Sequence, residues 1–270
     1  MRRPPRTQGD VVLGDGTELP VLYEDRAVMV IDKPVGWMFV PLGWARTDHN
    51  LQLALESSIR EAPHWVRKRN LRYLRYIHRL DAETTGAVML AKSPGALETY
   101  AKLFERRQIH KRYFAVVEDP VEEPEWRCDW PLTSSSGPRS RVEIDEELGR
   151  EARTDFRVLE RSAGRTLLEA CPWTGRTHQI RAHLAACGLP IAGDELYGAE
   201  PESGGPARGW RAESALGLRA VELRYVDPFS RREIHVTAPA KPFLQRYGFS
   251  MKHDPRPPKP QQDEKKQLSA

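Results

Sequence analysis

Short apolar runs separated by polar, turn-forming residues recur along the chain. A continuous apolar run of about four to eight residues is typical of a buried strand. One such run, residues 27–31, stops at Asp32-Lys33-Pro34. By this pattern we expect strands at residues 27–31, 87–91, 113–117, 141–144, 154–159, 166–170, 221–225 and 233–237. A turn at Asp227-Pro228 predicts that the last two strands form a hairpin.

Three other segments have helical features. Apolar residues within residues 51–59 recur every fourth position, which is the spacing of one helix face. Ser93-Pro94 predicts a helix start, because serine caps the first turn and proline suits the first helical position. A third helix is expected from about residue 177 to residue 187, ended by Gly188.

Strands outnumber helices in this pattern, and several are joined by connections too short for parallel crossovers. The sequence therefore predicts an α+β fold with a mixed, largely antiparallel central sheet flanked by helices. No internal repeat or interdomain linker is visible between residues 20 and 248. We expect one domain over residues 21–248, an N-terminal extension over residues 1–20 and a disordered tail over residues 249–270, which is poor in apolar residues.

Composition narrows the class of protein. With 39% hydrophobic and 30% charged residues in a chain of 270, a soluble protein is expected. No apolar run approaches the roughly 18 residues of a membrane span, and none follows the basic start, so no membrane association is expected. The three cysteines form no CxxC pair, which argues against a disulfide framework and a thiolate zinc site. We expect a monomer in the reducing cytoplasm.

Positive charge is clustered near one acid. The net charge is +4, and basic residues gather between Arg67 and Arg79, interleaved with Trp65, Tyr73 and Tyr76, and again at residues 106–112. This pattern favours a polyanionic partner such as nucleic acid. Asp81 lies two residues after Arg79. A carboxylate on a surface that binds a polyanion repels that ligand, so an acid at this position is expected to take part in chemistry. The alternative is an ordinary capping aspartate at the end of a strand.

A second constellation covers residues 174–184. On a helix, His178 and Arg181 share a face, whereas His178 and His183 point roughly 140° apart and cannot chelate one metal ion. The functional interpretation makes Arg181 a buried or half-buried partner that holds the Asp81 carboxylate ionised and oriented. The alternative is a helix with a solvated polar face. No GxGxxG or P-loop stands where a strand meets a helix, which argues against a nucleotide cofactor.

These strings together resemble a known family. Tyr76-Ile77-His78-Arg79-Leu80-Asp81 is similar to the HRLD motif of the RluA-type pseudouridine synthases, and residues 174–184 match their GRTHQIRxH motif. Residues 111–117 and Asp32-Lys33-Pro34-Val35-Gly36 resemble two further motifs of that family. The motifs stand in family order over roughly residues 21–240, and residues 188–198 look like the family's continuation of the second one.

The resemblance implies a role for each matching residue. Asp81 would be the nucleophile or essential carboxylate, and Arg181 its ion-pair partner. Arg79 would enter the RNA helix where the target base leaves. Tyr113 would be catalytic as well, stacking on the flipped uracil and moving a proton through its hydroxyl, and Ile180 would pack beneath the base. Both residues also suit ordinary core positions. By position in the same motifs, substrate-binding roles are implied for His78, Arg176 and His178.

The sequence departs from the family pattern at several positions. Ala82 and Thr85 replace commoner residues after the aspartate, and both are expected to be tolerated. Residues 38–41 read Met-Phe-Val-Pro where an apolar-His-Pro ending is commoner, so we expect the contacts of that loop to differ from those in the family. Residues 218–220 read Leu-Arg-Ala where Leu-His-Ala is usual, which is expected to alter packing near the last strands. Only 20 residues precede residue 21 in this sequence, so we expect no S4-like domain of the kind that larger relatives carry.

The implied function is isomerisation of uridine to pseudouridine in an rRNA or tRNA stem-loop, by base flipping and without cofactor or metal. The sequence leaves open whether a covalent adduct or a glycal-type intermediate forms. Two alternatives belong to other classes. An RNA-binding factor without the reaction would be expected to lack Asp81, Tyr113 or Arg181. A hydrolase acting through Asp81 would need a second carboxylate or a metal cluster, and the sequence spacing of Glu83 does not support that role.

Overall fold

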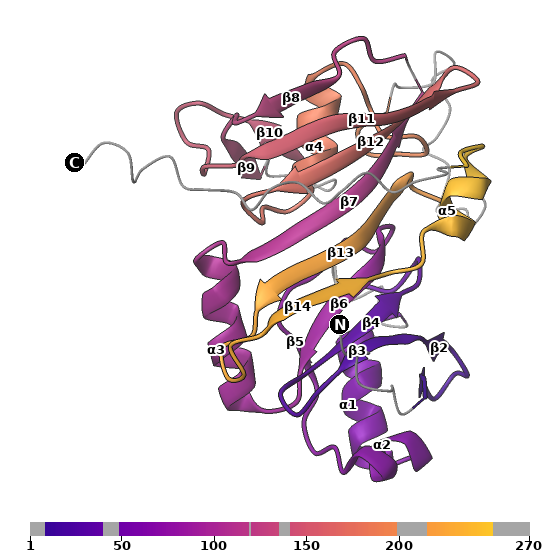
Figure 1. Cartoon of the computed structure of the whole chain (residues 1–270), viewed down its shortest axis with the longest axis vertical. Coiled ribbons are helices and arrows are strands. Elements are labelled where there is room, and N and C mark those ends of the chain that lie inside the picture. Colours follow the sequence, from indigo (N-terminus) through magenta and orange to yellow (C-terminus); the bar gives the residue numbers. More distant parts are fainter. Residues whose placement is uncertain (1–8, 40–48, 119, 135–140, 199–214, 251–270) are drawn as a thin grey trace.

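One mixed sheet of ten strands organises the computed structural model (Figure 1), which describes residues 9–39, 49–118, 120–134, 141–198 and 215–250. Its main path runs in the order β3 (Val21–Glu24), β4 (Val28–Lys33), β6 (Thr85–Ala91), β13 (Leu218–Val226), β7 (Ile109–Val117), β12 (Arg165–Pro172), β11 (Thr154–Ser162) and β8 (Glu125–Cys128). Two further strands are β14 (Glu233–Thr237), paired with β13, and β5 (Arg75–Tyr76), paired with β6. Among the described strands β6 and β13 run parallel, and the other ladders are antiparallel. The predicted fold class is confirmed.

Helices pack against both faces of this sheet. They are α1 (Leu51–Glu61), α2 (His64–Arg69), α3 (Pro94–Glu105), α4 (Gln179–Ala186) and α5 (Lys241–Arg246). The predicted cap of α3 is confirmed, because the Ser93 side chain accepts a hydrogen bond from the Ala96 backbone N–H at 3.1 Å. The helix predicted over residues 51–59 is α1. The helices α2 and α5 were not predicted, because six residues are too few to establish a periodicity.

The central strands are apolar on both faces because each face is covered. In β4, Val28 and Val30 belong to one hydrophobic cluster, while Met29 and Ile31 belong to the main cluster on the opposite face. Successive side chains of a strand point to opposite faces, so a continuous apolar run is what a doubly covered strand requires. The same division holds in β6.

Two small antiparallel ladders lie outside the main sheet. They are β1 (Val11–Val12) with β2 (Glu18–Leu19), and β9 (Leu132–Ser134) with β10 (Val142–Ile144). Val11 and Leu19 are fully buried in the main hydrophobic cluster, so the segment before residue 21 packs onto the sheet. At the other end Phe249 is buried, and residues 251–270 of the predicted tail lie outside the described residues. No helix in the described part of the chain is long and apolar enough to cross a membrane.

Part of the predicted basic surface is core. Arg69 is buried, and its Nε lies 2.9 Å from Glu24 Oε2. Arg112 is buried in an ion pair with Glu169. The Trp65 indole is also buried and donates to the Val12 carbonyl. These three residues therefore stabilise the fold, and Arg69 and Arg112 do not belong to the exposed part of the two basic clusters that favour an anionic partner.

Arg219 of β13, which stands where the family usually has histidine, contacts side chains of β4 and β6. Its Nη2 lies 2.6 Å from Asp32 Oδ2, and its Nη1 donates to Thr85 Oγ1 at 3.1 Å. Residues 40–41 of the other divergent segment lie outside the described residues. Next to Arg219, Gly86 has φ +113°, and a Cβ there would lie 2.1 Å from the Ala220 carbonyl oxygen. Only glycine therefore permits the close parallel pairing of β6 with β13.

Replacing this glycine should separate the two strands. We expect Gly86→Ala to lower the free energy of unfolding by on the order of 3 kcal/mol, because it adds both a steric overlap and an unfavourable φ. Denaturant unfolding would measure this. Gly95→Ala in α3 is the matched control, because a Cβ there meets nothing within 4 Å, and it should stabilise by roughly 0.5–1 kcal/mol. Equal stability of the two variants would contradict the argument.

Candidate active site

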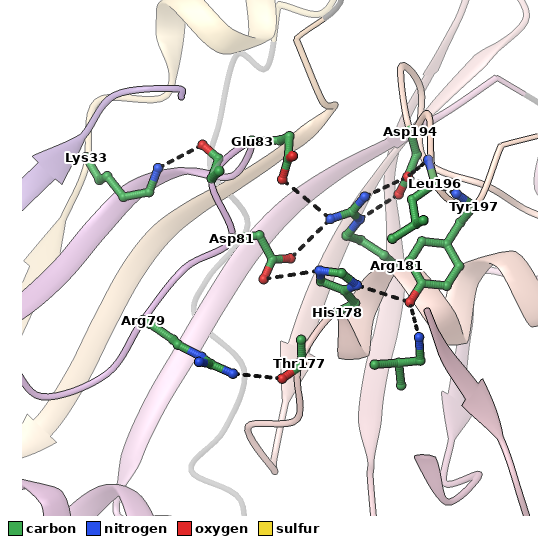
Figure 2. A network of polar contacts seen from close by, with 12 residues as sticks. Lys33, Arg79, Asp81, Glu83, Thr177, His178, Arg181, Asp194, Leu196 and Tyr197 are labelled. Atoms are coloured by element: carbon green, nitrogen blue, oxygen red, sulfur yellow. Dashed lines mark hydrogen bonds and ion pairs between the residues drawn. The ribbon is translucent and has the colours of Figure 1, made fainter. Parts of the chain in front are cut away.

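A cavity of about 570 Å³ lies between the loop at residues 77–84, strand β7 and the start of α4. It collects every residue singled out from the sequence: His78, Arg79, Asp81, Tyr113, Arg176, His178, Ile180 and Arg181. The two motifs are far apart in sequence, and Asp81 and Arg181 themselves are 100 residues apart. The fold therefore brings the two constellations into one site (Figure 2).

The loop that carries Asp81 is held at both ends. It joins β5 to β6, which pair antiparallel, and the Ile77 N–H donates to the Met89 carbonyl at 3.0 Å. Within the loop, the Thr84 N–H donates to the Asp81 carbonyl at 3.2 Å. The Asp81 side chain is partly exposed, at 22%. It is thus a fixed carboxylate that a ligand in the cavity can reach.

Lys33 ties this loop to β4. Its side chain is fully buried, and its Nζ donates to the carbonyls of Pro34 at 2.9 Å and Ala82 at 3.0 Å. The Gly36 N–H donates to the same Ala82 carbonyl at 2.8 Å. Burial lowers the pKa of Lys33 from 10.5 to about 7, although the charges of Asp81 and Glu83 oppose this shift. The DKPVG segment therefore clamps the backbone next to Asp81.

Arg181 connects the two sides of the cavity. Its Nε and Nη2 each lie 2.8 Å from an oxygen of Asp194, a bidentate pair, and its Nη1 lies 3.4 Å from Asp81 Oδ2 (Figure 2). The predicted contact between Arg181 and Asp81 is therefore present. Glu83 Oε2 also lies 3.6 Å from the same Nη1, which the sequence spacing had not indicated.

Asp194 is the buried counter-charge that makes this arrangement stable. Its side chain is fully buried, and its Oδ1 also accepts the backbone N–H groups of Leu196 and Tyr197 at 3.0 Å. Burial alone would lower the pKa of Arg181, but the hydrogen bonds and charge of Asp194, followed by the charge of Asp81, raise it overall. Arg181 therefore stays cationic inside the protein.

His178 lies at the other oxygen of Asp81. Its Nε2 is 3.9 Å from Asp81 Oδ1, and its Nδ1 is 3.2 Å from the Tyr197 hydroxyl (Figure 2). Burial lowers the pKa of His178 despite the opposing charge of Asp81, so the ring is neutral at neutral pH. His178 has φ +51° and precedes α4, which begins at Gln179. The prediction that His178 and Arg181 share a helix face is therefore wrong, although both reach Asp81.

Tyr113 and Ile180 form apolar walls of the cavity. Both are buried, as the alternative of core packing also required. Burial, with the negative charge of Asp81, raises the pKa of Tyr113. The phenol therefore keeps its proton at neutral pH, and it can donate a hydrogen bond but is a poor base.

The remaining predicted residues differ in how freely they can reach a ligand. Arg79 is exposed, and its Nη2 donates to Thr177 Oγ1 at 2.9 Å across the cavity (Figure 2). Arg176 is partly exposed, and its Nε donates to the Glu151 carbonyl at 2.9 Å. His78 Nε2 instead accepts the Met89 N–H at 3.1 Å. His78 therefore lines the cavity while it also fixes the loop to β6.

Sequence reasoning assigned no role to several residues that build the site. Gln179 is buried, and its Oε1 accepts from Thr174 Oγ1 and from the Arg176 N–H, which fixes the turn before α4. Lys111 Nζ donates to the Thr174 carbonyl across the cavity wall. Asp194 and Lys33 lie within segments that resemble motifs of the family, and this position was the sequence signal that could have identified them as site residues. Their partners could not be identified without the fold.

The arrangement presents an anionic carboxylate, held by a guanidinium, to a half-enclosed space with apolar walls. The neighbouring imidazole and phenol are neutral, so Asp81 and Arg181 are the charged pair at its centre. Within the described ranges no group of three or more His, Cys, Asp or Glu residues is placed to hold a metal ion. Such a site can act on a bound group through the carboxylate.

Comparison with known proteins decides the family. The model of the family described as RNA pseudouridylate synthase matches residues 27–186, which is more than half of the chain and includes Asp81 and Arg181. The chain belongs to the RNA pseudouridylate synthase family. The resemblance drawn from its motifs is thereby confirmed, and the protein is an RNA pseudouridine synthase.

Curated relatives of this pseudouridine synthase match over most of its length. It is 32% identical over 247 residues to "Ribosomal large subunit pseudouridine synthase D" of Xanthomonas campestris, covering 87% of this chain and 70% of that protein. It is 31% identical over 222 residues to "Dual-specificity RNA pseudouridine synthase RluA" of Yersinia pestis, covering 82% and 98%. Among solved structures, "Human RNA Pseudouridylate Synthase Domain Containing 1" superposes with a TM-score of 0.61 at 26% identity, covering 82% and 83%.

Removal of the buried counter-charge should disable the synthase. We expect Asp194→Asn to lower the free energy of unfolding by about 3–5 kcal/mol, because Arg181 would remain buried without its bidentate partner. If the variant folds, its kcat should fall on the order of 100-fold, since Asp81 loses its fixed neighbour. Denaturant unfolding and RNA modification assays measure both. The adjacent, exposed Glu195→Gln is the control and should match wild type; equal behaviour of the two variants would refute the role of Asp194.

His78 should make stability depend on pH. Burial, assisted by the charge of Lys111, lowers its pKa from 6.5 to about 3. Between these values the unfolded chain binds a proton that the folded chain does not, so acidification from pH 6.5 toward pH 3 destabilises the fold, by at most about 1.4 kcal/mol per pH unit. His78→Gln keeps a hydrogen-bond acceptor but cannot take the proton. The stability of wild type relative to this variant should fall from pH 7 to pH 4, and a constant difference would contradict the assignment.

Proposed function

We propose that this RNA pseudouridine synthase isomerises specific uridines in rRNA or tRNA stem-loops, with Asp81 as the essential carboxylate. The observation that supports the proposal is the ion pair between Asp81 and Arg181 inside the cavity, at 3.4 Å. The name of one relative refers to the large ribosomal subunit, which favours rRNA, and the name of another refers to dual specificity for RNA, which favours more than one target.

The reaction assigned to Asp81 is an isomerisation. The N1–C1′ bond of uridine breaks, the uracil turns, and a C5–C1′ bond forms, while the C5 proton is lost and N1 gains a proton. Asp81 assists the first step either by attacking C1′, which gives a covalent adduct, or by removing a sugar proton, which gives a glycal-type intermediate. Both routes return the carboxylate unchanged, and neither transfers electrons or an external group. We therefore propose that no cofactor is required.

The target base must leave its helix to reach Asp81. Extrusion of a base costs a few kcal/mol, which is offset when the base stacks in a protein pocket. The buried Tyr113 and Ile180 supply apolar surface for the uracil within the cavity. Because the Tyr113 phenol keeps its proton, we assign it stacking and hydrogen-bond donation rather than the role of a general base.

Arg79 is suited to occupy the space that the base leaves. It is exposed at the rim, and a single hydrogen bond to Thr177 Oγ1 fixes its guanidinium at 2.9 Å. Arg176 and His178 lie further along the same wall, where they can contact the sugar and phosphate of the extruded nucleotide. Unpaired loops are the favoured targets, because sequence-specific proteins read RNA mostly where bases are not paired.

Pseudouridine mapping of total RNA tests the function and names the substrate together. RNA from cells that lack the gene should lose pseudouridine at one or more positions. Wild type should restore every such site, whereas Asp81→Asn should restore none, because an amide can neither attack C1′ nor remove a proton at neutral pH. Glu83→Gln is the matched control, since it removes a neighbouring carboxylate from the same loop, and it should restore the sites.

The outcomes also separate the alternatives. Restoration by Asp81→Asn would end the proposal and favour an RNA-binding factor. Loss of all sites in Glu83→Gln as well as in Asp81→Asn would instead indicate that the isomerisation requires both carboxylates. An unchanged pseudouridine map in cells that lack the gene would favour a binding factor or a hydrolase. The Asp81→Asn protein should still bind RNA, which a gel-shift assay on the mapped stem-loop would measure.

A further inference from the structure

Trp173 stands in the cavity wall without an assigned role. It follows β12 directly and precedes the Thr174-Gly175-Arg176 turn, and it lines the same cavity as Asp81. Its side chain is partly exposed and belongs to none of the hydrophobic clusters formed by the described residues. By contrast, Trp37 and Trp65 are buried in the main cluster. Trp173 is therefore not explained by core packing.

Neighbouring side chains hold the indole in one position. Trp173 Nε1 donates to Asp155 Oδ2 at 2.6 Å, and the other Asp155 oxygen pairs with Arg127 at 2.6 Å. The guanidinium carbon of Arg153 lies 4.1 Å from the Trp173 ring centroid, within the range of a cation–π contact. One edge and one face of the ring are thus fixed, which lowers the entropy lost when a ligand binds.

Positive charge borders the indole on the same wall. Arg107 and Arg176 both line the cavity, and Arg150 is close enough that its charge, after burial, lowers the pKa of Arg176. Glu151 lies among them, with its carboxylate 2.6 Å from Arg107 Nη2 and its carbonyl accepting from Arg176 Nε. One carboxylate among three guanidiniums leaves a net positive charge.

A pre-oriented aromatic ring beside guanidiniums matches the chemistry of a single-stranded nucleotide. Bases stack on tryptophan whatever their identity, and arginine binds the adjoining phosphate. We propose that Trp173 is a stacking platform for the base of a nucleotide adjoining the target uridine, and that Arg107 and Arg176 hold the phosphate that joins these two nucleotides. This inference rests on the proposed function, and it adds a second base-binding subsite that would influence which uridines are chosen.

Steady-state kinetics on RNA from cells lacking the gene test the platform, with conversion followed at the mapped uridine. Trp173→Ala should raise KM for RNA roughly 10- to 100-fold and change kcat by less than about threefold, because stacking stabilises the bound RNA equally before and during the reaction. Trp173→Phe keeps a stacking face and should stay within about threefold of wild type. Trp126→Ala is the matched control, since Trp126 stacks on Phe156 elsewhere in the sheet, at 5.1 Å between centroids.

A substrate variant separates stacking from a purely structural role. Stem-loops are synthesised around the mapped uridine with an abasic nucleotide on its 5′ or its 3′ side. For wild type, one of the two should raise KM by about the factor that Trp173→Ala causes. For Trp173→Ala the same abasic nucleotide should add little, because the contact is already lost. Independent, multiplicative effects at both positions would overturn the proposal.

Salt dependence tests the phosphate contact. Arg107→Gln should reduce the slope of log Kd against log salt by about one for the mapped stem-loop, since one released counterion is lost. An unchanged slope would remove Arg107 from the subsite.

Failure of the subsite is distinguishable from failure of the proposed function. If wild type modifies RNA and Trp173→Ala has an unchanged KM, the platform is refuted while the activity stands. If wild type modifies nothing, ultraviolet crosslinking of the full chain to the same total RNA decides the matter. A crosslinked peptide at Trp173 would then support a nucleotide subsite in an RNA-binding factor, and its absence would overturn the proposal.

Discussion

The buried guanidinium of Arg181 is the constraint on which the site depends. A cation removed from water must be paired, and Asp194 supplies two oxygens at 2.8 Å in a bidentate contact that also fixes the plane of the guanidinium. With that plane fixed, Nη1 can point only toward the cavity, where it meets Asp81 and Glu83. The position of the Asp81 carboxylate is therefore set by a buried ion pair.

The sheet determines whether that contact can form. Asp81 lies on the loop before β6, and Arg181 lies on α4, which follows β12. Between these strands stand β13 and β7, so the register of three ladders sets the separation of Asp81 from Arg181. The parallel step from β6 to β13 needs Gly86, and the loop itself is clamped by Lys33. A displacement at either place would move Asp81 relative to a guanidinium that cannot follow it.

The sequence indicated the architecture where patterns are local. Apolar runs covered on both faces marked β4 and β6, and a serine-proline pair marked the start of α3. The residues to which the family resemblance assigned roles also line the cavity. The predictions that failed concerned residues whose contact partners lie far away in the sequence. Arg69 was taken for a surface cation because Glu24, its buried partner, lies 45 residues away. Asp194 and Lys33 were assigned no role for the same reason. His178 adopts a left-handed backbone conformation just before α4, and no residue propensity in the sequence indicated that the helix would begin after it.

The distribution of charge resolves the conflict that the sequence posed, an acid within the footprint of a polyanion. Around Asp81, burial keeps His178 and Tyr113 neutral, and the Arg181 guanidinium, which Asp194 holds in place, lies 3.4 Å from the carboxylate. The exposed cations, Arg79 and Arg107, lie on the rim of the same cavity. In the proposed function, phosphates stay at the rim while an uncharged uracil enters, so the proposed base flipping would meet an electrostatic constraint of this site as well as a steric one.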